Sequence, residues 1–227
     1  MEFVGRHLAS GNYNFVLAAL DAPIPALRGR DGRGWTLLHH AVWIDTPCHV
    51  VAKMIDSLGL SPNDKDGRGN TAMHDAGFQD VSPELVKLLL EKGGDPNQEN
   101  LFGETAVYEA SYRSGAAVMK VLLESGGNPD VITSDRGTPL LAAVTTRNCL
   151  EVISLLLKHG ANQKNKDYSN RSPSDIAREM KYHDAERLME RVSVCVAIFS
   201  ITIERLGKET TLRMLTPDLL RKVGDYL

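Results

Sequence analysis

The sequence lacks any apolar run long enough to cross a membrane. Its longest apolar-rich stretch, residues 192–203, has about 12 residues, two serines and a threonine among them, whereas a membrane-spanning helix needs roughly 20. Residues 1–11 contain no apolar core of signal-peptide length. We therefore expect a soluble protein without a membrane span, located inside the cell, in the cytoplasm, with the nucleus as the alternative.

The sequence also has few cysteines, namely Cys48, Cys149 and Cys195. Their number is odd and no two form a CxxC pair, which argues against a disulfide framework and favours a reducing compartment. The histidines beside Cys48 and at positions 39 and 40 lack the second pair of ligands that would complete a tetrahedral zinc site. We therefore expect no metal.

An excess of basic charge is absent as well, because 26 Lys and Arg residues stand against 29 Asp and Glu, giving a net charge of −3. Nucleic-acid-binding proteins usually concentrate Lys and Arg, so no nucleic-acid partner is expected. The sequence shows no glycine-rich phosphate loop, no Ser-His-Asp arrangement and no HExxH motif. It therefore predicts a protein that is not an enzyme and has no cofactor.

What the sequence does contain is an internal repeat. A Thr or Ser that precedes an apolar run recurs at spacings of 35, 34, 33 and 34 residues, at Thr36, Thr71, Thr105, Thr138 and Ser172. A second pattern recurs in step with the first. It consists of three apolar residues, two polar residues and a glycine, and it ends at Gly93, Gly126 and Gly160. The hydroxyl side chain can cap a first helix, and the glycine can end a second one in the left-handed conformation.

This period, with its T-P-L-H-like signature, resembles the ankyrin repeat. The resemblance implies an all-α ankyrin-repeat solenoid of stacked helix-turn-helix units with β-hairpin loops, because one unit alone cannot bury its apolar face. We assign residues 1–192 to this domain and residues 193–227 to a C-terminal helical tail. The expected units are an N-terminal cap over 2–30, then 31–65, 66–99, 100–132, 133–166 and 167–192.

Two departures from the pattern carry local predictions. Arg136 stands where the other hairpins have a glycine and Gly137 comes one place later, which predicts an irregular fourth hairpin. Tyr108 and Leu141 replace the histidine found at positions 39 and 74. We therefore expect the hydrogen bonds that this histidine makes across the hairpin base to be missing in those two repeats.

The aromatic residues, 13 in all, indicate where a partner binds. The position seven residues after the Thr holds Trp43, Phe78 and Tyr112, which stacked repeats would align in a column. The resemblance implies that this column faces a concave groove where partners bind, and aromatic and Arg side chains are common interface anchors. The alternative is that these rings only pack between helices. The full set of candidate protein-binding residues is Trp35, Trp43, Ile44, Phe78, Gln79, Phe102, Tyr112, Arg113 and Tyr168.

We expect a non-catalytic protein-interaction module that is a monomer in isolation and binds a protein partner of unknown identity through the groove and the hairpin tips. The charged tips, residues 30–33 and 63–66, are secondary contact candidates. Residues 193–206 are expected to form a helix, with a strand as the alternative because their apolar residues partly alternate, and the tail is interpreted as a cap for the last repeat. The alternative is a substrate receptor of a cullin-type ubiquitin ligase in which residues 193–227 recruit the ligase, because part of this segment is faintly similar to F-box-like and SOCS-box segments.

Overall fold

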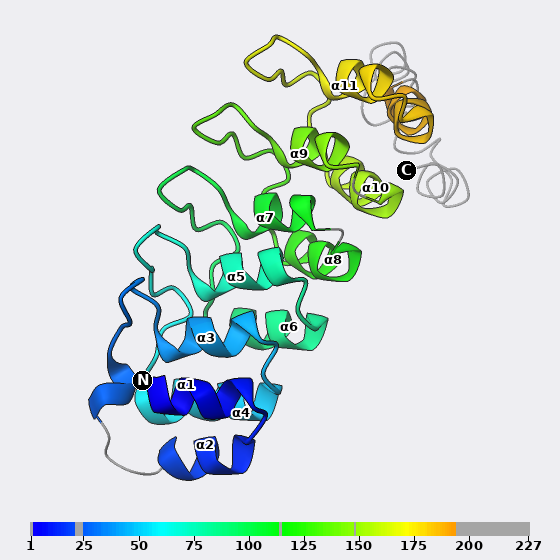
Figure 1. Ribbon diagram of the computed structural model, residues 1–227. Helices are drawn as coiled ribbons and strands as arrows, with labels where there is room; N and C mark the ends of the chain where they lie inside the picture. Colours follow the sequence, from blue (N-terminus) through cyan, green and yellow to red (C-terminus); the bar gives the residue numbers. More distant parts are fainter. Residues whose placement is uncertain (1, 21–24, 114, 148, 194–227) are drawn as a thin grey trace, which may run out of the picture.

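The computed structural model describes residues 2–20, 25–113, 115–147 and 149–193. Within them the chain forms pairs of antiparallel helices stacked in a row (Figure 1). The predictions for the tail from residue 194 onward, its helix, its capping role and its similarity to ligase-recruiting segments, lie outside the described residues. The proposed repeat boundaries remain predictions, although the helices follow the predicted period.

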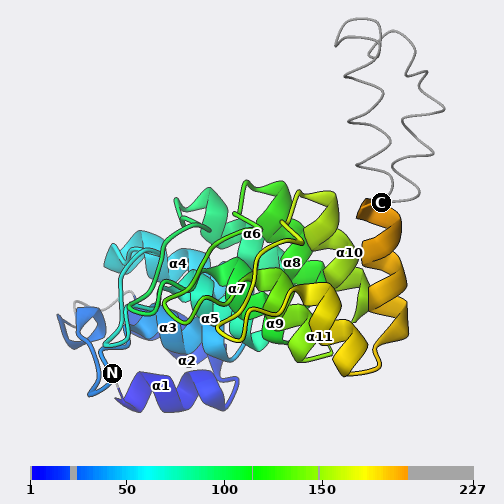
Figure 2. The same cartoon turned by 90° about the horizontal axis from the view of Figure 1, so that it is seen from above.

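The first helix of each pair belongs to one layer and the second to another. The first layer contains α1 (Glu2–Ala9), α3 (Leu37–Trp43), α5 (Ala72–Gln79), α7 (Ala106–Tyr112), α9 (Pro139–Thr145) and α11 (Pro173–Glu179). The second layer contains α2 (Tyr13–Leu20), α4 (Cys48–Leu58), α6 (Pro83–Glu91), α8 (Ala116–Glu124), α10 (Leu150–Lys158) and the helical residues 183–193. A short 3-10 helix, Pro25–Arg28, leads from α2 to the first hairpin. Neighbouring helices of one layer pack against each other along the stack (Figure 2).

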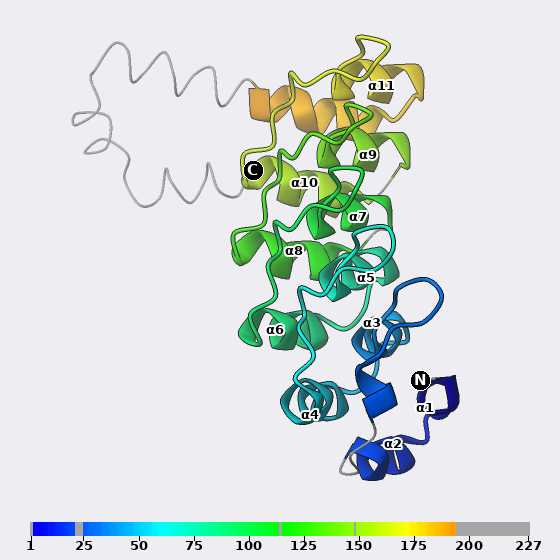
Figure 3. The same cartoon turned by 90° about the vertical axis from the view of Figure 1, so that its left-hand side faces the viewer.

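The hairpins between repeats project from one side of the helical layers, to the left in Figure 1 and toward the viewer in Figure 3. In the second hairpin the Asp66 N–H donates to the Asn70 carbonyl at 2.8 Å, and Gly69 has a φ of 79°. None of the described residues is assigned to a strand, so these hairpins are closed by turn hydrogen bonds.

The fourth hairpin is regular, and the prediction of an irregular turn at Arg136 was wrong. Arg136 itself takes the left-handed conformation, with a φ of 58°, that Gly69 has in the equivalent turn. The closing bond is also kept, because the Thr133 N–H donates to the Gly137 carbonyl at 3.0 Å. The hairpin geometry therefore outweighs the steric cost of a side chain at a positive φ.

Backbone hydrogen bonds connect successive hairpins and fix their register. The Gly67 N–H donates to the Arg33 carbonyl at 2.9 Å, and the Leu101 N–H donates to the Arg68 carbonyl at 3.0 Å. A third bond of this kind joins Ser134 to Phe102 at 2.8 Å. The first four hairpins are thus attached to one another by main-chain atoms, independently of side-chain identity, whereas the fifth contacts the fourth through the Tyr168 hydroxyl.

Histidine adds a second connection between repeats. The Thr71 N–H donates to Nδ1 of His74 at 3.0 Å, so the ring proton is on Nε2, which donates to the Glu104 carbonyl at 3.0 Å. His39 makes the same bonds to Thr36 and to Asn70. Burial lowers the pKa of both histidines, which keeps these rings neutral.

The prediction for the two repeats without histidine needs one correction. Leu141 has an aliphatic side chain that cannot form these bonds. The Tyr108 hydroxyl, in contrast, lies against the next hairpin, where a Cβ on Gly137 would come within 2.5 Å of it. The same hydroxyl forms a hydrogen bond with the Thr133 side chain of that hairpin, so Tyr108 keeps a polar contact between repeats by a different route.

A continuous apolar core runs between the two layers. Fully buried residues from successive repeats include Leu37, Leu85, Leu122, Leu156 and Met189. Because each repeat supplies only part of this core, the stack is stabilised by its neighbour contacts rather than by any single unit.

We predict that Gly77→Ala destabilises the protein by about 1–3 kcal/mol, the usual cost of overpacking. Gly77 lies in α5, where an added Cβ would meet the Ala106 carbonyl oxygen of α7 at 2.5 Å. Chemical denaturation measures the change. Gly32→Ala is the control, because nothing lies within 4 Å of a Cβ at Gly32. Equal stability of both variants would show that α5 and α7 do not depend on this close approach.

Candidate functional site

A continuous aromatic surface connects the second repeat to the third. The rings of Trp35 and Trp43 have centroids 5.2 Å apart, and Trp43 stacks on Phe78 at 5.7 Å with an interplanar angle of 19°. Trp35 is fixed by its indole N–H, which donates to an Asp66 carboxylate oxygen at 3.1 Å. We call Trp35, Trp43 and Phe78 the aromatic wall. Each of its rings stays partly exposed.

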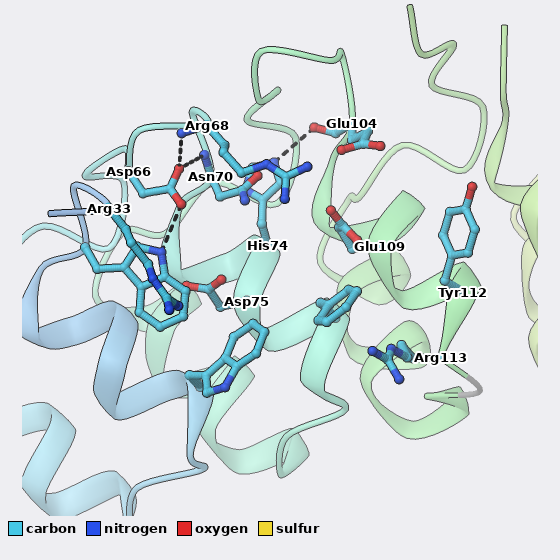
Figure 4. Close-up of a pocket in the computed structure, with 13 residues that line it drawn as sticks. Arg33, Asp66, Arg68, Asn70, His74, Asp75, Glu104, Glu109, Tyr112 and Arg113 are labelled. Carbon is cyan, nitrogen blue, oxygen red and sulfur yellow. Dashed lines mark hydrogen bonds between the residues drawn. The ribbon is translucent and has the colours of Figure 1, made fainter. Parts of the chain in front are cut away.

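The aromatic wall borders a pocket of about 810 Å³, which side chains from three consecutive repeats line (Figure 4). Its lining residues come from the hairpins and from α3, α5 and α7. Besides the aromatic wall they are Arg33, Asp66, Arg68, Asn70, His74, Asp75, Glu104, Glu109, Tyr112 and Arg113.

The arginines of the pocket already lie over aromatic rings. The Arg113 guanidinium carbon is 4.2 Å from the centroid of Phe78, and that of Arg33 is 5.7 Å from Trp35. Arg68 lies over the hairpin residue Phe102 at 5.3 Å. Such cation–π contacts orient the guanidinium groups and show that these rings accept cations on their faces.

Two carboxyl groups of the pocket have strongly raised pKa values. Asp75 is only 3% exposed and its Oδ2 has no hydrogen-bond partner. Burial and, to a lesser extent, the charges of Asp66 and Glu109 raise the pKa of Asp75 to about 8. Burial, with the charge of Glu104, raises the pKa of Glu109 to about 7. Both groups turn toward the pocket from facing helices (Figure 4).

Five of the nine predicted binding residues come together at this pocket. They are Trp35, Trp43, Phe78, Tyr112 and Arg113. Trp43 and Phe78 stack as the column predicts, but the Tyr112 ring contacts Tyr108 instead, with a centroid distance of 5.4 Å. Arg113, the residue after Tyr112, packs its guanidinium group against the Phe78 ring instead.

The other four predicted residues do not line the pocket. Ile44 is exposed at the end of α3, and Gln79 is half-buried as the last residue of α5. Phe102 is 42% exposed on its hairpin. Tyr168 is 68% exposed, and its hydroxyl donates to the Ser134 carbonyl at 2.8 Å. Whether any of the nine residues binds a partner stays a prediction.

The carboxyl groups of the pocket are not among the binding residues predicted from the sequence. A signal for them exists, because Asp75 and Glu109 both lie four residues after the repeat Thr. The aromatic position is three residues further on, which places both positions on the same helix face. What the sequence does not show is the burial of Asp75, because neighbouring repeats create it.

The comparisons with known proteins agree with this architecture. A family model described as "Ankyrin repeats (3 copies)" matches residues 76–167. The chain carries ankyrin repeats. A crystal structure of an ankyrin-repeat domain from Acinetobacter baumannii AYE superposes with a TM-score of 0.72 at 25% identity, covering 84% of this chain and 97% of that one.

Two curated relatives are partial matches. The B-cell lymphoma 3 protein homolog of Mus musculus is 34% identical over 60% of this chain and 31% of its own length. A putative ankyrin repeat protein of Acanthamoeba polyphaga mimivirus is 31% identical over 43% of this chain and 58% of its own length. The matched region thus covers less than two thirds of either relative.

The ankyrin repeat is a general protein-interaction module and is typically non-catalytic. Among the described residues, no three His, Cys, Asp or Glu side chains are grouped so that they could hold a metal ion. No helix in this part of the chain is long and apolar enough to cross a membrane.

The buried Asp75 carboxyl predicts a pH-dependent stability. Its pKa of about 8 in the folded chain lies above the ordinary value of 3.8, so the folded state keeps a proton that the unfolded state loses. This contribution to stability therefore decreases as the pH rises from about 4 to about 8. Asp75→Asn removes the contribution, and we expect the variant to gain about 1–3 kcal/mol over the wild type between pH 5 and pH 8.

Denaturant unfolding at several pH values measures this gain. Glu124→Gln, at an exposed position of α8, is the matched control and should follow the wild-type curve. Parallel stability curves for Asp75→Asn and the wild type would contradict a raised pKa at Asp75.

Proposed function

We infer that the pocket beside the aromatic wall binds a segment of a protein partner. The observation that carries this proposal is the set of stacked, partly exposed rings at a pocket of about 810 Å³. Aromatic and Arg side chains provide much of the binding energy at protein interfaces. A pocket of this size and composition suits an extended peptide or the end of a loop.

The rigidity of the pocket supports the same proposal. Trp35 is fixed by Asp66, while His74 connects its helix to the following hairpin. Arg113 already rests on the Phe78 ring. Side chains that are ordered before binding lose little conformational entropy when a partner arrives.

The hairpin tips are the proposed secondary contacts, because Phe102 and Tyr168 expose much of their rings next to the groove side of the stack. We place this interaction inside the cell, in the cytoplasm, as the scarcity of cysteine suggests. The substrate-receptor alternative requires residues 193–227 to recruit the ligase, and it stays a prediction because the structure describes only residue 193 of this segment.

The test compares proteins retained from an extract of the native cells by the wild type and by a Trp43→Ala/Phe78→Ala variant. We expect the double variant to lose the specifically retained partner by about tenfold or more, as is typical for removing two aromatic anchors. Quantitative mass spectrometry of the retained proteins gives the ratio, and circular dichroism verifies that the variant is folded.

The control is Phe15→Ala, which removes an exposed ring from α2 in the other layer. It should retain the same proteins as the wild type. If the folded double variant also retains them in full, the pocket is not the binding site.

A further inference from the structure

One oxygen in the pocket has no partner within the described part of the chain. Asp75 is only 3% exposed, and its buried Oδ2 accepts no hydrogen bond. A buried polar atom without a partner costs stability, and a charged one costs more. Asp75 is also one of the residues that line the pocket, so a ligand there could supply the missing donor.

The surroundings of Asp75 attract positive charge. Burial is the main cause of the raised pKa of Asp75, and the carboxylates Asp66 and Glu109 add to it, so negative groups lie close to Asp75. The aromatic wall presents ring faces beside them, and ring faces attract cations through their quadrupole. Carboxyl groups and the ring faces of the aromatic wall thus line the same pocket as the unsatisfied Oδ2 of Asp75.

We propose that the pocket receives the cationic end of an arginine or lysine side chain of the partner, which donates a hydrogen bond to Asp75 while its stem lies along the aromatic wall. This inference rests on the proposed function and adds the chemistry of the recognised residue. Arginine fits better than lysine, because its planar guanidinium stacks on rings and its five N–H groups can reach two carboxylates together.

The chain's own arginines do not satisfy Asp75. Arg33, Arg68 and Arg113 each lie over a ring, at 5.7, 5.3 and 4.2 Å from its centroid. They demonstrate that guanidinium groups bind these faces, yet Oδ2 of Asp75 remains without a donor. A partner cation would therefore make the same kind of cation–π contact that Arg33 and Arg113 make in the pocket. It would also supply the hydrogen-bond donor that Oδ2 of Asp75 lacks.

An acidic partner segment is the competing possibility, because the same three arginines line the pocket or its edge. It would leave Asp75 unpartnered and would bring further negative charge close to Asp66 and Glu109, which like-charge repulsion disfavours. A metal ion is also disfavoured, because the described carboxylates are not grouped as ligands of one ion.

The test uses tryptophan fluorescence, since the only two tryptophans of the chain, Trp35 and Trp43, both line the pocket. The probes are N-acetyl-arginine methylamide and its lysine analogue. The controls are the citrulline and norleucine analogues, which match them in size without the charge, and the glutamate analogue. Sodium chloride keeps the ionic strength equal in every titration.

We expect saturable fluorescence changes with the arginine and lysine probes, with dissociation constants on the order of 1 mM for ligands of this size. At pH 8, Asp75→Asn should weaken arginine binding by about tenfold or more, because an amide cannot ionise to pair with the bound cation. Glu124→Gln should leave binding unchanged. Equal responses to citrulline, stronger binding of the glutamate probe, no saturable binding, or an unaffected Asp75→Asn variant would each overturn the proposal.

A second measurement on the unmodified chain does not depend on the folding of a variant. Asp75 and Glu109 hold protons near neutral pH, and a bound cation favours their ionised forms. Arginine binding should therefore tighten by about tenfold or more between pH 6 and pH 8, with release of protons. Binding that is independent of pH would contradict a contact with Asp75.

The other titratable or charged groups facing the pocket, or packed against α5 from α3, are Arg33, His39, Asp66, Arg68, His74, Glu104 and Arg113.

The two proposals fail in different experiments. If the aromatic-wall variant loses its protein partner but the arginine probe does not bind, the pocket binds proteins by other chemistry and only the cation inference is wrong. If the aromatic-wall variant retains every partner, the proposed function itself is wrong.

Discussion

The register between successive hairpins is the constraint on which the rest of the structure depends. Main-chain bonds such as Gly67 to Arg33 and Leu101 to Arg68 join the first four hairpins in order, and the buried neutral histidines His39 and His74 add bonds from α3 and α5 to the following hairpins. Because these connections use backbone atoms and a fixed offset, equivalent side chains of neighbouring repeats are placed side by side. Trp43 can stack on Phe78 only because both repeats keep this offset.

The same constraint explains how an unfavourable group persists in the pocket. Asp75 follows directly after His74, whose ring is held at both nitrogens, so its backbone position is determined by the contact between repeats. The packing of three repeats thus maintains a buried acceptor whose local cost is small compared with the core that the stack buries.

The helix pairs and the stacking could be predicted from the sequence because the signal is repeated. Five hydroxyl residues in phase locate the first helices, and the glycines at 93, 126 and 160 end the second ones with φ values of 86°, 86° and 91°. Arg136 could not be judged in this way, because the hairpin bonds imposed a left-handed conformation that its residue type disfavours. In the pocket, the aromatic positions followed from the period. The raised pKa of Asp75 did not, because it results from burial by other repeats.

A site assembled from three repeats also couples binding to the stack itself. Trp35 belongs to the second repeat, Asp75 to the third and Glu109 to the fourth, so separating any two of these repeats destroys the pocket. A ligand that binds only the assembled pocket stabilises the folded state by about RT ln(1 + [L]/Kd). In a solenoid whose stability is a sum of neighbour contacts, that gain is confined to the two interfaces that the pocket spans. Partner binding would therefore protect the middle of the stack from local opening more than its two ends.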